Sequence, residues 1–480
     1  MTQEPHVRFF VSALAQGRTL NSGLGRRPPP VVRRRGFVPR HHRNASGLQS
    51  AQDLTVFFTL PVGIGAGLLG ADYTLTPPMT GAITIPAGSS SVTLLLMPLQ
   101  DSRNEGTEVM TATLTANPAY VLGTPSTGTL QIRDNDTVPL PLSYTLTEIG
   151  PVSKPTYGMG VNSSGVVAGY WLPSPPPSDW SGFSWQNGNF TTLEVVPGCP
   201  GDCGPAYGLG INDSGVVVGY RGNGGELPIV WTSGTPTFLG TLGLAYGNQA
   251  MAINNAGNIV GASMNSAGKS HAVLWQAGTT AAQDWGTLNG FDASKESFAT
   301  SINSVGRAVG KSMISANNTT FHAFRTPALQ PILLGDRDDL GSLVGVESAI
   351  SEANWINDLD EVVGATTVGN GQYHAFWKDG HSAKHQAFVD LGVLSGDDYS
   401  MALGLNNTGH SVGYSEKSST GVQRATVWFN NGTMYDLLTK VNNGSGWTLK
   451  SAEAINNSGW IVGWGVKNGY DRAFLLVPNY

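Results

Sequence analysis

Short runs of apolar residues alternate with turn-forming residues along most of the chain, and one arrangement of the two recurs seven times. Each copy has an apolar residue, an asparagine, a short turn and a largely apolar run that ends in glycine seven residues after the asparagine. Successive copies lie 42 to 54 residues apart. Their asparagines are Asn162, Asn212, Asn254, Asn303, Asn357, Asn406 and Asn456. A repeat of this length is typical of proteins built from one supersecondary unit used many times.

The residues around each asparagine predict a tight β-hairpin. Asparagine at the first position and glycine at the fourth suit a type I turn closed by a left-handed residue, and the flanking Ile and Val residues supply two buried strands. The left-handed position is glycine in six copies and Asp360 in the fifth. Aspartate is one of the few residues that tolerate this conformation, so from the turn alone we expect Asp360→Gly to be neutral or stabilising. Because the asparagine recurs in every copy, we interpret it as scaffold rather than as a ligand-binding residue.

Two further short strands recur between these hairpins. One starts with a His-Ala-Phe-like sequence, as at His271, His322 and His374. The other is a Leu-Gly-like strand, expected around Ile149, Leu193, Leu239, Trp285, Leu334, Leu391 and Leu437. Four short strands in roughly 50 residues make one propeller blade. The three histidines occupy one repeated position, so we interpret them as strand-start residues rather than as a metal cluster.

The order of the strands predicts a closed ring. The repeat region begins with a Leu-Gly-type strand at 144–149 and ends with its usual hairpin partner at 472–477. Elsewhere such partners are neighbours in sequence, so here the two ends of the region have to meet, whereas an open solenoid would leave two bare sheet edges. We therefore predict an all-β fold in which residues 138–480 form a closed seven-bladed β-propeller.

The repeated unit also resembles a known family. The combination of His-Ala-Phe-Leu-Trp, Asp-Leu-Gly and Ile-Asn-Asn-x-Gly-x-Val-Val-Gly resembles the bacterial extracellular repeat of the HAF family. The sequences His322-Ala323-Phe324 and His374-Ala375-Phe376 match the motif that names the family. The resemblance covers the seven repeats and implies a secreted or surface-exposed bacterial propeller. No agreed activity comes with it.

Residues 51–137 show a different pattern, in which apolar and polar residues alternate over short runs separated by Pro and Gly. Such alternation is typical of a β-sandwich. With Asp72-Tyr73-Thr74-Leu75, Ile85-Pro86-Ala87-Gly88 and the terminal Asp134-Asn135-Asp136, the segment is similar to the C-terminal part of a Calx-beta domain. The first strands of that family are absent, so we expect an incomplete sandwich.

The resemblance to Calx-beta domains implies a calcium site on loops at one end of the sandwich. Ca²⁺ takes six to eight oxygen ligands, which several carboxylates on converging loops can supply. The acids that match the family's positions are Asp72, Asp101, Glu105, Asp134 and Asp136. Gln100 departs from the family, which often has another aspartate there. The alternative is that these acids bind no metal and only make the exposed loops polar.

Composition and charge narrow the class of protein further. Residues 1–50 carry nine arginines and one acid, Glu4, in a proline-rich sequence. We predict a disordered arm there; the alternative, a polyanion-binding arm, rests on the clustered arginines. The whole chain has a net charge of −6, 63 glycines and 12% charged residues, which argues against coiled coils, helical bundles and proteins that coat nucleic acids. We expect no nucleic-acid partner and, since no run of 18 apolar residues occurs, no transmembrane segment.

Two remaining features could form a disulfide bond or bind a cation or a partner. Cys199 and Cys203 lack the second ligand pair of a structural zinc site, so we expect a small disulfide loop. The segment 335–355 holds the densest acidic cluster of the repeats, which could bind a cation or a basic partner, although a solvated loop is the default expectation. Its acids are Asp336, Asp338, Asp339, Glu347 and Glu352. No phosphate-binding glycine loop, HExxH helix or Ser/His/Asp signature is present.

The sequence supports two hypotheses about function. In the first, the protein is a non-enzymatic, monomeric binding or adhesion protein of the cell exterior or cell surface. An unidentified protein or glycan would bind one face of the propeller, and the upstream module would bind calcium. In the second, it is a propeller-type hydrolase or lyase acting on polysaccharide, which needs two carboxyl groups about 5–10 Å apart. Acids inside the repeats are few and show no obvious pairing, so we favour the first hypothesis and expect no enzymatic activity.

Overall fold

The chain divides into two compact units, Met1–Val138 and Pro139–Tyr480. The computed structural model describes residues 7–13, 19–25, 53–59, 73–76, 81–87, 91–98, 107–122, 127–133, 140–173, 180–193, 204–222, 226–290, 292–314, 320–327, 334–380, 382–430 and 432–480. In these residues the fold is all-β, with two short 3₁₀ helices, η1 (Asp336–Asp338) and η2 (Leu437–Lys440). Within the same residues no helix has the length and apolar character needed to span a bilayer.

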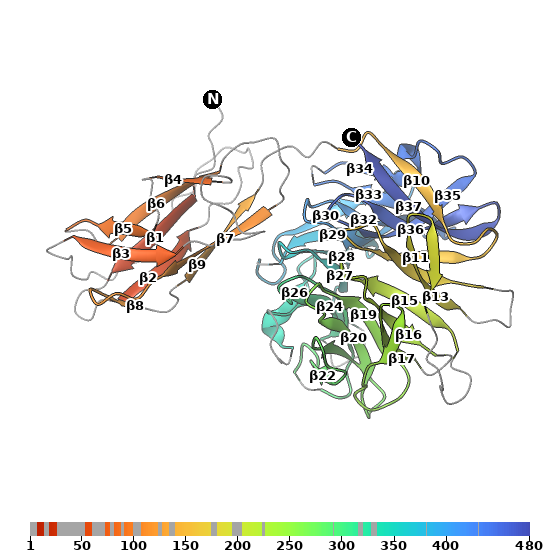
Figure 1. Ribbon diagram of the computed structural model, residues 1–480, viewed down its shortest axis with the longest axis horizontal. Helices are drawn as coiled ribbons and strands as arrows, with labels where there is room; N and C mark the ends of the chain where they lie inside the picture. The colour runs from red at the N-terminus through yellow and green to blue at the C-terminus, as the bar shows by residue number, and fades with distance from the viewer. Residues whose placement is uncertain are drawn as a thin grey trace. The chain divides into compact units, whose positions relative to one another are not determined.

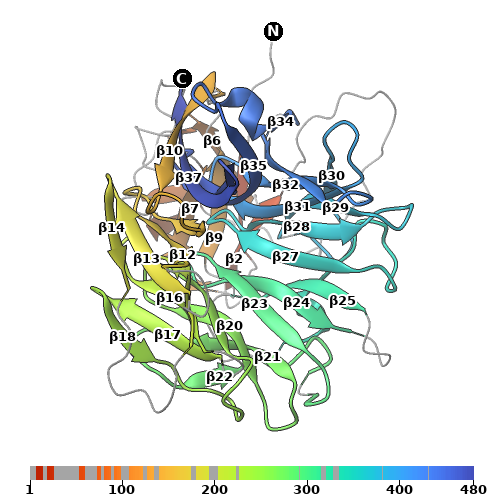
Figure 2. The same ribbon diagram turned by 90° about the vertical axis from the view of Figure 1, so that its right-hand side faces the viewer.

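The described part of Pro139–Tyr480 contains seven four-stranded antiparallel sheets, which follow one another in chain order (Figure 2). Six of them are meanders of consecutive strands. The first three are β11 (Thr156–Val161), β12 (Val167–Trp171), β13 (Ser181–Gln186) and β14 (Asn189–Thr192); β15 (Ala206–Ile211), β16 (Val217–Arg221), β17 (Leu227–Thr232) and β18 (Thr235–Phe238); and β19 (Gln249–Ile253), β20 (Ile259–Met264), β21 (Ser270–Trp275) and β22 (Ala282–Asp284). The next three are β23 (Ser297–Ile302), β24 (Ala308–Met313), β25 (Phe321–Arg325) and β26 (Asp339–Gly341); β27 (Ser351–Ile356), β28 (Glu361–Thr367), β29 (Tyr373–Asp379) and β30 (Phe388–Gly392); and β31 (Tyr399–Leu405), β32 (Ser411–Lys417), β33 (Val422–Trp428) and β34 (Met434–Asp436).

The seventh sheet joins the two ends of this unit. Its strand order is β10-β37-β36-β35. These strands are β10 (Ser143–Ile149), β35 (Trp447–Ile455), β36 (Ile461–Lys467) and β37 (Tyr470–Asn479). Strands β10 and β37, yellow-orange and dark blue in Figure 1, pair antiparallel, with Tyr144 opposite Pro478 and Ile149 opposite Ala473. The predicted pairing of 144–149 with 472–477 is therefore confirmed.

The repeated asparagines link neighbouring sheets into a closed cycle. Each side-chain Nδ2 donates to the backbone carbonyl of the asparagine in the next sheet, over 2.9 to 3.2 Å, and Asn456 of the last sheet donates to Asn162 of the first. The Oδ1 of Asn162 accepts backbone N–H groups of its own turn, from Ser164 and Val166. All seven asparagines are buried. The interpretation of these residues as scaffold is confirmed, and the bond between sheets explains why each copy needs the amide.

The glycine that ends each repeat is required by close packing within the sheet. A Cβ atom at any of the seven positions would lie only 1.8 to 2.1 Å from a carbonyl oxygen of the first strand, that of the residue just before the one that faces the glycine. These glycines are Gly169, Gly219, Gly261, Gly310, Gly364, Gly413 and Gly463. A β-bulge follows the facing position in each first strand. The bulge bends the first strand towards the second, and only glycine leaves room for its backbone.

The hydrophobic core lies between adjacent sheets rather than on one face of a single sheet. Ala168 on β12 packs against Trp231 of the second sheet, and Val218 on β16 packs against Trp275 of the third. Trp231 is 1% exposed and Trp275 is fully buried. The short apolar run of each second strand is therefore covered on both sides, which accounts for its continuous hydrophobic sequence. The described structure of this unit is a propeller-like all-β fold (Figure 2).

The fourth strand of the fourth sheet differs from the sequence-based expectation. Leu334 was expected to centre this strand, but β26 is formed five residues later by Asp339–Gly341. Leu334 instead donates its backbone N–H to the carbonyl of Trp285 at 2.7 Å and is 2% exposed in the core between the third and fourth sheets. A leucine that fills an inter-sheet core has the same local pattern as one in a short strand, so the pattern alone selects the wrong residue.

The unit Met1–Val138 contains two sheets in its described residues, with strand orders β4-β6-β1-β2-β8 and β5-β3-β7-β9. The strands are β1 (Val7–Ala13), β2 (Thr19–Gly25), β3 (Leu54–Thr59), β4 (Tyr73–Thr76), β5 (Ala82–Ile85), β6 (Ser91–Pro98), β7 (Thr107–Leu114), β8 (Val121–Leu122) and β9 (Thr127–Arg133). Alternate residues of β3 are buried and exposed, as the alternating sequence pattern predicts for a sheet with one covered face.

The prediction of a segment without strands over residues 1–50 is wrong for β1 and β2. Strand β1 pairs antiparallel with β6, with Phe9 opposite Leu94, and β2 pairs with β1. Val7–Ala13 is rich in β-branched and aromatic residues, which suit a pleated strand. Without β1, β6 would have one unpaired edge. Two strands from the N-terminal segment thus belong to this sheet, and the rest of that segment lies outside the described residues.

Candidate functional site

The residues proposed from sequence for calcium binding cannot be located in the structure. Asp72, Asp101, Glu105, Asp134 and Asp136 all lie outside the described residues, as do Cys199 and Cys203. The calcium site and the disulfide loop therefore stay predictions. The described residues contain two other side-chain clusters that could bind a ligand or an ion, and both lie in Pro139–Tyr480.

The first cluster includes a pair of residues, one basic and one acidic, that recurs in the sheets. His271, His322 and His374 are each the second residue of a third strand, near its start as expected. Each Nδ1 lies 2.9 to 3.0 Å from an aspartate of the fourth strand of its own sheet. Those partners are Asp284, Asp339 and Asp390. In the sixth and seventh sheets arginine takes the place of histidine, in Arg424 with Asp436 and Arg472 with Glu148. The recurring base and acid tie the outer two strands together, so we assign these pairs to the scaffold.

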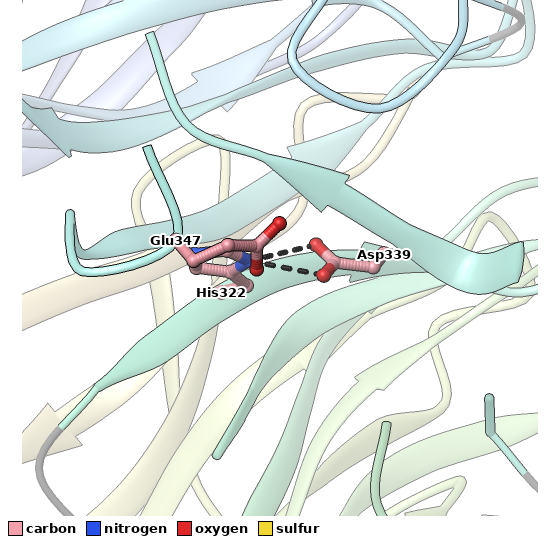
Figure 3. A group of neighbouring side chains, drawn as sticks. All are labelled: His322, Asp339 and Glu347. Atoms are coloured by element: carbon pink, nitrogen blue, oxygen red, sulfur yellow. Dashed lines mark hydrogen bonds and ion pairs between the residues drawn. The ribbon is translucent and has the colours of Figure 1, made fainter. Parts of the chain in front are cut away.

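One of these pairs belongs to a larger charged group. His322 on β25, Asp339 on β26 and Glu347 place ligand atoms within 4.8 Å of one another (Figure 3). The Nδ1 of His322 lies 3.0 Å from both carboxylate oxygens of Asp339, to which its N–H donates. Its Nε2 is buried and has no hydrogen-bond partner among the described residues. One imidazole and two carboxylates are a donor set that divalent cations accept.

The ammonium group of Lys384, from the fifth sheet, already supplies positive charge to this group. Its Nζ lies 2.7 Å from Asp339, 2.9 Å from Glu347 and 3.6 Å from Asp336. Burial would raise the pKa of Asp339, but hydrogen bonds from His322 and Lys384 hold this pKa below its usual value. Burial would lower the pKa of Lys384, but its bonds to Asp339 and Glu347 raise it. In this part of the acidic segment Asp339 is buried and Glu347 and Asp336 are exposed, and all three form an ion-pair network with Lys384 from the neighbouring sheet.

The second cluster lies at the ends of the strands away from the asparagine turns. Six half-buried aromatic side chains from the seventh, first and second sheets form it, and we call them the aromatic face: Tyr157, Tyr170, Trp180, Tyr207, Tyr220 and Trp464. Tyr157 stacks on Tyr170 at 5.1 Å between ring centroids and meets the edge of Trp464 at 5.2 Å. Tyr170 meets Tyr207 at 5.0 Å, and Tyr207 stacks on Tyr220 at 4.7 Å. The rings therefore form one continuous set of contacts across three sheets.

Two carboxylates belong to the aromatic face. The indole N–H of Trp464 donates to Glu453 at 3.2 Å, and the hydroxyl of Tyr157 donates to Asp471. Burial raises the pKa of Glu453, and hydrogen bonds from Ser451 and Trp464 offset only part of this effect. Burial and then the negative charge of Glu453 raise the pKa of Tyr170. Aromatic faces and edges next to carboxylates can bind sugar rings or organic cations.

The aromatic face occupies the positions at which the repeats differ from one another. The residue after the repeat glycine is Tyr170, Tyr220, Ala262, Lys311, Ala365, Tyr414 and Trp464 in the seven sheets. The turn asparagine and the closing glycine are the same in all seven. A backbone position that is geometrically equivalent in every sheet but holds Tyr, Ala, Lys or Trp has no single scaffold role. This variation is the sequence signal that could have pointed to the aromatic face, because it becomes visible once the repeats are compared position by position.

Comparisons with known proteins add little to this picture. No protein-family model matches the chain, and no curated protein matches it. Among solved structures, a puromycin hydrolase S511A mutant complexed with PGG shares 12% sequence identity, over 67% of this chain and 53% of that one, with a TM-score of 0.44. A putative TolB from Agrobacterium tumefaciens shares 12% identity, over 60% of this chain and 94% of that one, with a TM-score of 0.38. The matched part thus spans about half the length of the puromycin hydrolase chain.

Proposed function

We propose that this protein is a non-enzymatic binding protein, built on a closed seven-bladed β-propeller, whose ligand sits on the aromatic face. The observation that carries this proposal is the continuous set of half-exposed rings from Tyr157 to Trp464, next to Glu453 and Asp471. Aromatic side chains dominate binding energetics because they bury large areas and lose little conformational freedom on binding. The seven sheets and the closed cycle of asparagine bonds support the propeller with seven blades.

The proposal also keeps the setting that the sequence resemblances imply. The repeats that resemble the HAF family favour a secreted or cell-surface protein, and adhesion is a role that such a binding face would serve. The upstream unit would bind Ca²⁺ through Asp72, Asp101, Glu105, Asp134 and Asp136. Isothermal titration of the full chain with Ca²⁺, compared with Asp134→Asn/Asp136→Asn, tests this part separately. Equal heats from both proteins would contradict the calcium site.

A ligand screen tests the binding function itself. The full-length chain would be applied to an array of glycans, with and without calcium, beside the variants Trp464→Leu and Tyr480→Leu. Trp464 belongs to the aromatic face, whereas Tyr480 is 59% exposed and lies beside Gly459 at the asparagine-turn end. We expect Trp464→Leu to lose at least 90% of the signal of any true ligand and Tyr480→Leu to keep it. Signals that both variants retain would show that binding takes place elsewhere.

The state of Glu453 favours a second candidate, a hydrolase or lyase acting on polysaccharide. A carboxylic acid whose pKa is raised by burial is the kind of group that can donate a proton to a glycosidic oxygen. The same mechanism needs a second carboxyl group, for which Asp471 is the candidate on this face. Incubation with polysaccharides followed by a reducing-end assay distinguishes the two functions. Turnover that Glu453→Gln abolishes would establish the enzyme, and binding without turnover would establish the binding protein.

A further inference from the structure

A group of residues in the fourth sheet is equivalent in position to part of the aromatic face, and there a lysine side chain lies next to the aromatic rings. The strand registers show which residues of the fourth and first sheets are equivalent. Phe298 corresponds to Tyr157, Lys311 to Tyr170 and Phe321 to Trp180. The ammonium of Lys311 lies 6.0 Å from the ring centre of Phe298 and 5.6 Å from that of Phe321. It also forms a 2.7 Å ion pair with Glu352. This position therefore holds a cation between aromatic rings and a carboxylate.

The aromatic face has the rings and the carboxyl groups, but among the described residues it has no such cation. Glu453 accepts a hydrogen bond from Trp464, and Asp471 accepts one from Tyr157. No lysine, arginine or histidine forms a salt bridge with either acid in the part of the chain that the structure describes. Other acids in the sheets do have basic partners, as Glu352 has Lys311 and Glu148 has Lys467 and Arg472. The aromatic face thus carries two carboxyl groups that have no basic partner among the described residues.

We propose that the ligand of the aromatic face is an organic cation, an alkylated ammonium group that is held against the Tyr and Trp rings beside Glu453. The inference rests on the proposed binding function and narrows it to one class of ligand. The negative face of an aromatic ring attracts a cation within about 6 Å of its centre, and tryptophan and tyrosine do so most strongly. A carboxylate at the edge of the rings adds charge complementarity.

An alkylated ammonium group fits this surface better than a primary one. A primary ammonium such as that of Lys311 needs close hydrogen-bond acceptors, which Glu352 supplies in the fourth sheet. On the aromatic face the acids already accept hydrogen bonds from Trp464 and Tyr157. In a quaternary ammonium the positive charge is spread over the methyl groups. These groups can contact ring faces directly and need no hydrogen bonds.

Titration of the full-length chain with choline tests the inference. The matched probe is the neutral isostere of choline, in which a quaternary carbon replaces the quaternary nitrogen, so that only the charge differs. We expect choline to bind at least tenfold more tightly than the isostere. Glu453→Gln, which keeps an oxygen to accept from Trp464, should weaken choline binding at least tenfold and leave the affinity for the isostere unchanged. Asp358→Asn, which removes an exposed acid at the asparagine-turn end, should change neither affinity.

Further variants keep the test decisive if Glu453→Gln does not fold. Trp464→Phe and Tyr170→Leu each alter one ring and should each weaken choline binding at least threefold, with folding checked by circular dichroism. Equal affinities for choline and its isostere, or choline binding that all three face variants retain, would overturn the inference. A glycan from the array that binds in a Trp464-dependent manner, with no choline binding, would overturn it while leaving the binding function intact. Failure of every array glycan, of choline and of its isostere to bind the face would contradict both.

Discussion

The side-chain amide of Asn456 donates to the backbone carbonyl of Asn162 at 2.9 Å, across 294 positions of sequence. This bond closes a cycle that begins with the bond from Asn162 to Asn212 and passes once through every sheet. Each asparagine uses its oxygen for its own turn and its nitrogen for the neighbouring sheet. The same residue therefore stabilises the hairpin and the ring.

Replacing Asn456 by aspartate should destabilise the ring unit by about 1–3 kcal/mol, because a buried donor is lost and a carboxylate faces the carbonyl of Asn162. The control is Asn430→Asp, since Asn430 makes the same kind of bond, to the carbonyl of Thr408 at 2.9 Å, in an exposed position. We expect that control to change stability by less than about 0.5 kcal/mol. Urea unfolding of both variants measures the difference, and equal midpoints would contradict a role for the buried cycle.

Ending the chain at Tyr470 should destabilise the whole of Pro139–Tyr480, not only the last sheet. The deletion removes β37, which pairs with β10 on one side and with β36 on the other. Two strands then lose a partner, and the ring opens next to its first sheet. Thermal unfolding followed by circular dichroism should show a transition that is broader and lower by many degrees. A truncated chain that melts as the full chain does would show that the ring does not depend on closure.

Gly165 and Gly215 occupy the same turn position with nearly the same backbone angle, φ of 75° and 76°. A Cβ atom on Gly165 would lie 2.0 Å from Cζ3 of Trp460, whereas a Cβ on Gly215 meets nothing within 4 Å. Gly215→Ala should therefore cost only the strain of the left-handed conformation, about 1–2 kcal/mol, and Gly165→Ala should cost clearly more. Equal unfolding free energies for the two variants would show that Trp460 does not pack against the turn.

Asp360→Gly should be destabilising by about 1–3 kcal/mol, which reverses the expectation drawn from turn geometry alone. Asp360 has the left-handed conformation that the turn requires, with φ of 62°. Its buried carboxylate also forms an ion pair with Arg307 and accepts a hydrogen bond from Asn303 at 3.1 Å, both in the preceding sheet. Glycine at this position would remove the backbone strain of the turn, but Arg307 and Asn303 would lose the carboxylate that they contact. A double-mutant cycle with Arg307→Met measures the coupling, and a coupling near zero would restore the original expectation.

The stability of the ring should depend on pH through His410. Burial lowers the pKa of this imidazole to about 4, whereas an unfolded histidine has a pKa of about 6.5. As the pH falls below about 6.5, the unfolded chain takes up a proton that the folded chain refuses, so the stabilising contribution is present above that pH and is lost towards pH 4. The loss amounts to about 3 kcal/mol.

His410→Val is the matched variant for this measurement, since valine stands at the same turn position in Val166. Unfolding free energies measured between pH 7 and pH 4 should fall more steeply for the wild type than for the variant. Carboxylates contribute to acid unfolding in both proteins, so the difference between the two slopes isolates His410. Parallel curves would show that the imidazole does not change its environment on folding.

The sequence by itself determined the repeated unit of the ring. The spacing from Asn162 to Gly169 specifies a turn and two strands, because the contacts that form them lie within one hairpin. Seven copies of the same pattern make this assignment surer than any single copy could. The closing pair, 144–149 with 472–477, also followed from sequence, because the strand order leaves one partner at each end. Leu334 departed from expectation because its decisive contact lies in a neighbouring sheet, and the contacts of Asp360 with a neighbouring sheet are the reason for the revised prediction on Asp360→Gly.

Only the tertiary structure decided which side chains gather between sheets. Tyr157 meets Trp464 because the last sheet returns to the first, and Lys384 meets Asp339 because a loop of the fifth sheet reaches the fourth. Strand β1 pairs with β6, which is distant in sequence, as in the pair Phe9 and Leu94. Local sequence patterns arise from the periodicity of a single strand or turn, and they carry no information about which distant side chain lies opposite. The candidate site of this protein combines hairpin pairs with such distant pairs, so its full set of contacts forms only when the ring is closed.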